Sequence, residues 1–160
     1  MKPGHHAAFS IVISGILYSI FKSWGLAVAS LISGIFVDLD HIIDYWIEYG
    51  LRFDLKQFFN YFDEKNFENR KKLFFVFHGW EWLIVLVTAA WLTGWNLWVT
   101  GLLIGYGQHM VIDELYNSSN YRIRPYVRGY SLLWRWKNGF EFKTPCSNAD
   151  NSDKNNDQMH

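Results

Sequence analysis

Four long runs with few or no charged side chains dominate the first two thirds of this 160-residue chain. They cover residues 7–21, 24–37, 73–93 and 97–108. Gly25, just after Lys22-Ser23, and the stretch Thr93–Asn96 indicate tight turns. Runs joined in pairs by such turns predict an all-α fold, a four-helix up-down membrane bundle made of two helical hairpins. The first two runs are shorter than the about 20 residues of a comfortable span, so a peripheral or soluble bundle is the alternative.

The other segments are amphipathic, basic or polar. Residues 50–72 mix apolar and charged side chains, which predicts an amphipathic interfacial helix between the hairpins, although an amphipathic helix of a soluble protein fits the same pattern. Residues 117–143 combine Arg and Lys with Tyr and Trp. We expect one membrane-embedded helical domain over residues 1–143 and a disordered polar tail over residues 144–160.

Charge and cysteine content restrict the partners and the metal chemistry. The net charge is zero, so no nucleic-acid partner is expected. Cys146 is the single cysteine, which excludes an intrachain disulfide and a thiolate zinc cage. Lys and Arg collect in the connection 49–72 and in the C-terminal segment, whereas the hairpin turns carry only Lys22. The positive-inside rule then predicts an integral protein of a bacterial-type inner membrane with both termini in the cytoplasm.

Histidine and carboxylate side chains recur at the ends of the four runs. In an up-down bundle all of these positions fall at the same end, and such groups bind divalent metals. Ionisable groups close to a membrane core are costly, which favours a functional reason for them. The candidate metal ligands are His6, Asp38, Asp40, His41, His78, His109 and Asp113.

Helical spacing sorts several of these candidates by face. His109 and Asp113 are four residues apart, and each can reach the same ion. His78 and Glu81 are three residues apart and also share a helical face. A helix cap or an ordinary surface residue is the alternative for each of them taken alone.

The stretch from Asp38 to His41 needs more than helical spacing. Asp38 and His41 share a face, because they are three residues apart. Asp40 points away on a continuous helix, so it joins the site only if the chain turns near Val37. Otherwise Asp40 orients a metal-bound histidine through a hydrogen bond, as carboxylates commonly do.

Oxygen and imidazole ligands without thiolate suit zinc, our first choice, and also manganese or iron. The candidates outnumber the ligands of one tetrahedral ion, so one or two ions are expected. Two ions would activate a water molecule and hold the oxygens of a phosphoryl centre. A carboxylate outside the ligand set would act as general base, and Glu81 is the predicted catalytic residue, with Glu114 as the alternative.

These motifs resemble those of the YdjM-like membrane-bound metal-dependent hydrolases. That family has a Gly-His-x-x-Phe-Ser-like start, then Pro-Asp-x-Asp-His, Thr-His-Ser and Gly-Tyr-x-x-His-x-x-x-Asp. The matching residues, all within residues 4–117, are His6–Ser10, Val37–His41, Phe77–Gly79 and Gly105–Asp113. The chain departs from the pattern at Val37, where the family has Pro, and at Leu73, where it often has another His.

The resemblance implies a metal-dependent hydrolase, and the family's distant similarity to zinc-dependent phospholipases C and nucleases implies phosphoester hydrolysis. We therefore expect an enzyme that acts on a lipid-like phosphoester at the cytoplasmic interface, with membrane lipid as a partner. Residues 122–137 would hold an anionic substrate or anchor the chain through interfacial aromatics. The alternatives are a non-catalytic metal-binding membrane protein or transporter, and a soluble helical adaptor. A transporter needs ionisable groups deep in the bundle, whereas here they lie at one end.

Overall fold

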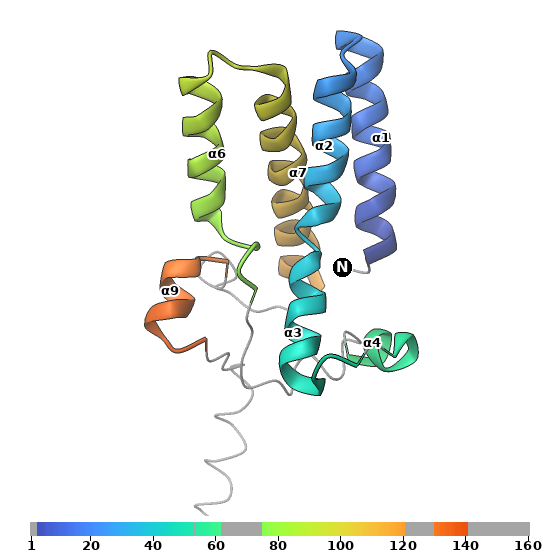
Figure 1. Cartoon of the computed structure of the whole chain (residues 1–160), viewed down its shortest axis with the longest axis vertical. Coiled ribbons are helices and arrows are strands. Elements are labelled where there is room, and N and C mark those ends of the chain that lie inside the picture. The colour runs from blue at the N-terminus through green and yellow to red at the C-terminus, as the bar shows by residue number, and fades with distance from the viewer. Residues whose placement is uncertain (1–2, 53, 62–74, 121–129, 141–160) are drawn as a thin grey trace, which may run out of the picture.

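A computed structural model of the chain describes residues 3–52, 54–61, 75–120 and 130–140. The regular structure of these residues is entirely helical, which confirms the all-α part of the predicted fold (Figure 1). The helices are α1 (Pro3–Phe21), α2 (Trp24–Phe36), α3 (Leu39–Tyr49), α4 (Leu55–Tyr61), α6 (Trp80–Leu92), α7 (Leu97–Asn120) and α9 (Leu132–Lys137).

Four of these helices lie side by side, with α1 against α2 and α6 against α7 (Figure 1). Helix α2 also packs along α7 and so joins the two pairs. Ser23 caps α2, because its hydroxyl oxygen accepts a hydrogen bond from the backbone N–H of Leu26 at 3.3 Å. The α1–α2 and α6–α7 turns lie at the end of the helices away from the N-terminus (Figure 1).

Glycines on α7 bring its backbone against α2. A Cβ atom at Gly105 would overlap the carbonyl oxygen of Ser30, and one at Gly101 would overlap that of Leu26. These two positions therefore have no room for a side chain, as is common where membrane helices approach closely. Gly107 is different, since its Cβ would meet Leu83 at an ordinary 3.5 Å.

The second apolar run does not continue as one regular helix. Helix α2 ends at Phe36, Val37 and Asp38 form a turn, and α3 begins at Leu39. This is the turn that Asp40 needs in order to face the same site as Asp38. Among the described residues, only the stretch Trp24–Tyr49 across this turn has the length and apolarity of a membrane span, and core helices of soluble proteins share these properties.

The predicted helical start of the third run is wrong. Residues 75–79, here called the His78 loop, are not helical, and α6 begins only at Trp80. Gly79 immediately before it has an extended backbone, with φ of −134° and ψ of 132°. His78 and Glu81 therefore do not share a helical face, because the chain changes direction between them.

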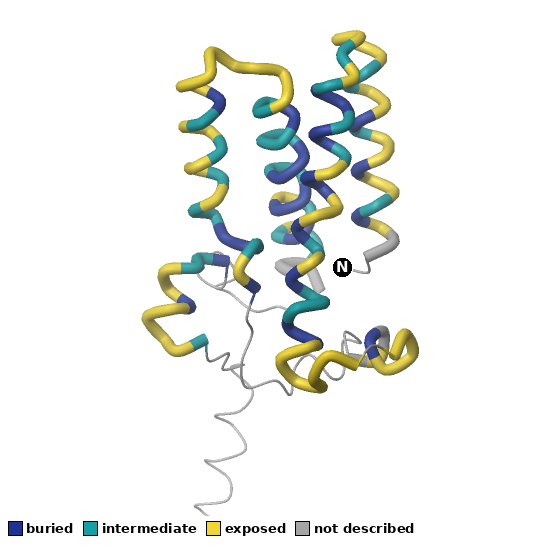
Figure 2. The backbone as a smooth tube through the Cα atoms, viewed as in Figure 1, coloured by how far each residue is buried: buried dark blue, intermediate teal, exposed yellow. Residues whose placement is uncertain are grey.

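Helices α3, α4 and α9 gather at the same end as the start of α1 (Figure 1). Buried residues line the facing sides of α2 and α7, the inner side of α6 is mostly half-buried, and exposed residues follow the outer sides (Figure 2). At the α9 end, Val37, Tyr106, Met110 and Tyr130 form a buried cluster. Helix α4 coincides with part of the predicted amphipathic segment. Residues 62–74, residues 121–129 and 141–143 of the basic segment, and the polar tail lie outside the described residues.

Candidate metal centre

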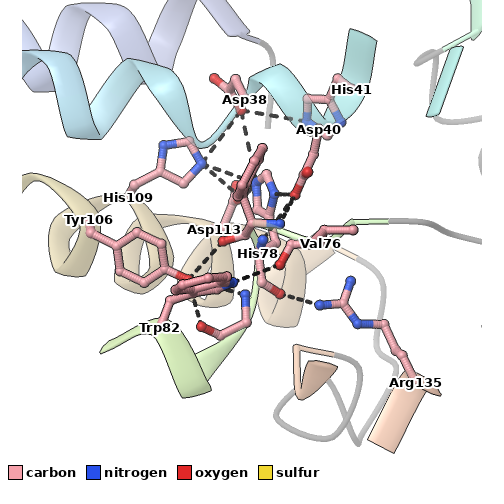
Figure 3. A network of polar contacts seen from close by, with 12 residues as sticks. Asp38, Asp40, His41, Val76, His78, Trp82, Tyr106, His109, Asp113 and Arg135 are labelled. Atoms are coloured by element: carbon pink, nitrogen blue, oxygen red, sulfur yellow. Dashed lines mark hydrogen bonds and ion pairs between the residues drawn. The ribbon is translucent and has the colours of Figure 1, made fainter. Parts of the chain in front are cut away.

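Six of the predicted ligands meet at this end of the helices. Figure 3 labels all of them except His6. Three helices, one turn and one loop supply them, so residues far apart in the sequence form one cluster. The six are His6 on α1, Asp38 in the α2–α3 turn, His41 on α3, His78 in its loop, and His109 and Asp113 on α7.

Two imidazole rings occupy the centre of the cluster. The Nε2 atoms of His78 and His109 are 3.2 Å apart. Nδ1 of His109 lies 2.8 Å from the carbonyl oxygen of Gly34, and Nδ1 of His78 lies 3.1 Å from Oδ2 of Asp40. Because a carbonyl and a carboxylate only accept hydrogen bonds, both Nδ1 atoms carry the protons. This tautomer directs the electron pairs of both Nε2 atoms at a common point, as metal-bound histidines do.

Asp113 completes a triangle of ligand atoms. Its Oδ2 lies 3.5 Å from Nε2 of His78 and 3.6 Å from Nε2 of His109. A tetrahedral zinc ion with bonds of about 2.0–2.1 Å holds its ligand atoms about 3.3–3.4 Å apart. The three observed separations are close to that length, so the side chains fit one ion with little movement.

Asp38 and His6 extend the cluster on either side of this triangle. Oδ1 of Asp38 lies 3.5 Å from Nε2 of His109 and 3.5 Å from Nε2 of His41, and has no hydrogen-bond donor among the described residues. Nε2 of His6 lies 2.9 Å from Oδ1 of Asp113, and its ring stacks on His109 with 4.2 Å between centroids. The ligand atoms form three overlapping groups, which can serve one ion or two neighbouring ions.

The cluster is accessible from one edge. His6, His78, His109 and Asp113 are all buried, with at most 5% of each residue exposed. The side chains of Asp38 and His41 keep 15% and 17% of their surface exposed. Asp38 and His41 are thus the two candidate ligands nearest to solvent.

The charge on His78 depends on the surrounding carboxylates. Burial alone lowers the pKa of His78, but hydrogen bonds to Asp113 and Asp40, together with their charges, outweigh burial and raise the pKa to about 9. In the metal-free protein near pH 7, a proton thus lies on Nε2 of His78, facing His109. It occupies the position that a metal ion would take.

Asp40 reaches the site but contacts the far nitrogen of His78 and belongs to none of the ligand groups. The turn at Val37 does bring its carboxylate into the site, where it is fully buried. Its Oδ2 accepts hydrogen bonds from Nδ1 of His78 and from the backbone N–H groups of Phe77 and His78. Asp40 was predicted as a direct ligand, yet these contacts make it the group that orients His78.

Glu81, the predicted general base, lies in the first turn of α6, and its carboxylate contacts the start of α9. Its carboxylate accepts hydrogen bonds from the hydroxyl of Ser131 at 2.6 Å and from the backbone N–H groups of Leu132 and Leu133 at 2.9 and 3.1 Å. It therefore caps the start of α9 across the chain. Among the described residues, the metal-ligand groups do not include Glu81.

Sequence reasoning missed the residues that hold the His78 loop. The hydroxyl of Tyr106 lies 2.8 Å from the carbonyl oxygen of Phe77 and 2.6 Å from that of Gly79, and Arg135 donates to the carbonyl of His78. Tyr106 could have been found, because it precedes His109 by three residues on α7 and shares its face. Arg135 is 57 residues from His78, and no local pattern points to it.

Comparison with known proteins does not add a relative. No family model, curated protein or solved structure matches the chain. The chemistry of the cluster therefore follows from its own contacts.

Proposed function

We propose that the cluster binds a divalent metal ion, with zinc as the first choice, and that the chain is a membrane-bound metal-dependent hydrolase of the YdjM-like kind. The proposal rests on His78 and His109, whose Nε2 atoms are 3.2 Å apart. The Nδ1 atom of each ring faces a hydrogen-bond acceptor, which leaves the Nε2 atoms to bind a metal ion. Two imidazoles fixed in this tautomer and flanked by Asp113 offer one shared set of electron pairs. Nitrogen and oxygen donors of this kind suit zinc, manganese or iron.

A hydrolytic role is supported by the accessible edge of the cluster. When bound, a divalent ion lowers the pKa of a coordinated water to about 7 and polarises a phosphoryl oxygen. Asp38 is partly exposed, and its Oδ1 has no hydrogen-bond donor among the described residues. If Asp38 does not coordinate the ion, its carboxylate can accept the proton of an attacking water, the role first predicted for Glu81, whose carboxylate is engaged by α9.

A membrane location is supported by the outer surfaces of the helices. Large apolar side chains point away from the core along α1, α6 and the start of α7, and a belt of this kind matches lipid tails better than water. The exposed side chains include Ile16, Ile20, Ile84, Trp91, Leu92 and Trp98. The cluster lies at the end that also carries α3, α4 and α9, so a site at the membrane interface would meet phosphorylated lipid headgroups.

The test is a measurement of metal content and hydrolysis on the full chain in mild detergent. We expect about one or two zinc or manganese ions per chain, from the number of ligands. Hydrolysis is measured on a soluble phosphodiester and on phospholipid micelles, for wild type, Asp38→Asn and Glu81→Gln. If Asp38 is the base rather than a ligand, Asp38→Asn keeps its metal and slows turnover by about a hundredfold to ten-thousandfold, and Glu81→Gln does so less. A Glu81→Gln variant that keeps its metal and loses turnover would restore Glu81 as the base.

A non-catalytic metal site is the second candidate, and the burial of the cluster favours it. Structural zinc sites are closed, whereas catalytic sites keep an open position. Four of the six candidate ligands are buried here, and only Asp38 and His41 are partly accessible. Tight zinc binding without hydrolysis of any phosphoester in the panel would support this candidate over the enzyme.

A further inference from the structure

The His78 loop presents its backbone polar groups inside the protein without a helix to pair them. Side chains from three other segments pair them instead. Asp40 accepts from the N–H groups of Phe77 and His78, and Tyr106 contacts the carbonyl of Phe77 and both backbone groups of Gly79. The indole of Trp82 donates to the carbonyl of Val76 at 2.9 Å (Figure 3). The loop is thus fixed by side chains, since buried backbone groups without partners are costly.

The carbonyl of the ligand residue itself is held by Arg135. Nη2 of Arg135 donates a hydrogen bond to the carbonyl oxygen of His78. Only 6% of Arg135 is exposed, which is unusual for a cation and requires compensating negative charge. Burial lowers the pKa of Arg135, while the charges of Asp40 and Glu81 oppose that shift. Arg135 therefore lies where the carboxylate that orients His78 stabilises its charge.

Glu81 fixes the short helix that carries Arg135. Its three hydrogen bonds hold the first residues of α9, and the N–H of Trp80 donates to the carbonyl of Tyr130 at 3.0 Å. The first turn of α6 is thereby joined to α9 just before Arg135 reaches back to His78. Hydrogen bonds therefore join the His78 loop, the first turn of α6 and the start of α9 to one another.

We propose that Arg135 is a positioning residue of the metal centre, which holds His78 from its carbonyl side while Asp40 holds it from its ring. Helix α9 is then part of the centre although it supplies no ligand, and Glu81 contributes by keeping α9 in place. This inference rests on the proposed metal binding. It predicts that changes on α9 alter metal affinity without touching a ligand.

The first experiment compares zinc affinity of the full chain in detergent, by competition with a chromophoric chelator. Arg135→Met should bind zinc about 10- to 100-fold more weakly than wild type, the usual effect of losing an orienting partner. Arg135→Lys keeps one donor and should recover part of the affinity. Lys137→Met removes the same charge from an exposed position of the same helix and should bind as wild type does. Glu81→Gln should weaken binding less than Arg135→Met.

A general loss of structure is distinguished by spectroscopy and exchange. The visible spectrum of the cobalt-substituted protein should change in Arg135→Met and not in Lys137→Met, because only the former moves a ligand. Hydrogen exchange of the metal-free protein should speed up at residues 77–79 in Arg135→Met while the amides of α2 and α7 keep their protection.

The outcomes separate this inference from the proposed function. Zinc affinity of Arg135→Met within twofold of wild type, with an unchanged cobalt spectrum, overturns the positioning role. Equal loss of affinity in Lys137→Met also overturns it, since charge alone would then be responsible. A wild type that binds no divalent metal refutes the proposed function instead, and unaltered exchange at residues 77–79 would then refute the role of Arg135 in fixing the loop.

Discussion

Two imidazole nitrogens facing each other at 3.2 Å decide what the cluster can do. Each ring has its other nitrogen fixed by an acceptor, Gly34 for His109 and Asp40 for His78. The pair therefore shares either a proton or a metal ion. Single substitutions around this pair test whether the metal is the biological occupant.

The first prediction concerns the central ligands. His109→Ala removes one of the facing nitrogens, so metal affinity should fall by more than the about 10- to 100-fold that loss of an orienting partner costs. His5→Ala is the matched control, because His5 precedes His6 but is exposed. Metal content is measured by mass spectrometry after gel filtration in detergent. Full retention in His109→Ala would place the bound metal elsewhere.

The second prediction concerns pH. Because the pKa of His78 is raised to about 9 in the metal-free protein, a metal ion must displace its proton at neutral pH. Zinc affinity should therefore rise by about tenfold per pH unit between pH 7 and 9 for one displaced proton. The free energy of unfolding of the metal-free protein should instead fall as pH rises over this range. The raised pKa contributes stability that is complete below about pH 6.5 and is lost as pH rises through about 9.

Titrations of zinc affinity and of thermal unfolding check this linkage. His78→Gln should flatten both profiles between pH 7 and 9, because the titrating group is gone. Profiles of His78→Gln that keep the wild-type slopes would assign the proton to another group.

At the scale of elements, the close contact of α2 and α7 sets the distance across the cluster. His109 on α7 donates to the carbonyl of Gly34 on α2, so the two ligand-bearing elements are locked in register. Gly101 and Gly105 permit this approach, since a Cβ atom at either would overlap backbone of α2. The packing of two apolar helices thus determines the geometry of a polar site at their end.

The third prediction follows from this contact. Gly105→Ala forces α7 away from the carbonyl of Ser30 and should destabilise the protein by about 1–3 kcal/mol, the usual effect of overpacking. Gly107→Ala is the control, because its Cβ meets Leu83 at 3.5 Å and removes a helix-interior glycine. The midpoint of thermal unfolding in detergent should fall for Gly105→Ala and stay equal or rise for Gly107→Ala. Equal midpoints for wild type and Gly105→Ala would show that the helices are further apart.

At the scale of the whole molecule, the candidate ligands lie at one end of four helices that have apolar outer surfaces. The four long helices expose Ile, Val, Leu and Trp side chains, and the candidate ligands meet at one end of them. Helices α3, α4 and α9 lie together at that end (Figure 1). This arrangement agrees with the proposed site at a membrane interface. It makes the sidedness of the chain measurable.

The fourth prediction concerns that sidedness. Single cysteines at Asn96 and at Arg52, in a Cys146→Ser background, should react with a membrane-impermeant maleimide from opposite sides of the membrane. Positive-inside orientation assigns Arg52 to the cytoplasm. Labelling of both positions from the same side, or recovery of the folded protein in the soluble fraction, would contradict the membrane bundle.

The sequence by itself determined the helical class and the residue types of the site. Hydropathy and short turns are local properties, and they were enough to place α1, α2 and α7 and to group His109 with Asp113. Local spacing failed where the backbone leaves the helix. The His78 loop exists because Asp40, Tyr106 and Arg135 pair its backbone groups, and these partners are between 27 and 57 residues away along the chain.

Only the tertiary structure decided which carboxylates face the cluster. Asp40 and Glu81 have equivalent chemistry in the sequence, and both were candidates for direct roles. The turn at Val37 buries Asp40 beneath His78, and the start of α6 at Trp80 turns Glu81 toward α9. The role of each carboxylate depends on the hydrogen-bond donors that packing places around it. Those donors come from distant segments that no local sequence pattern connects.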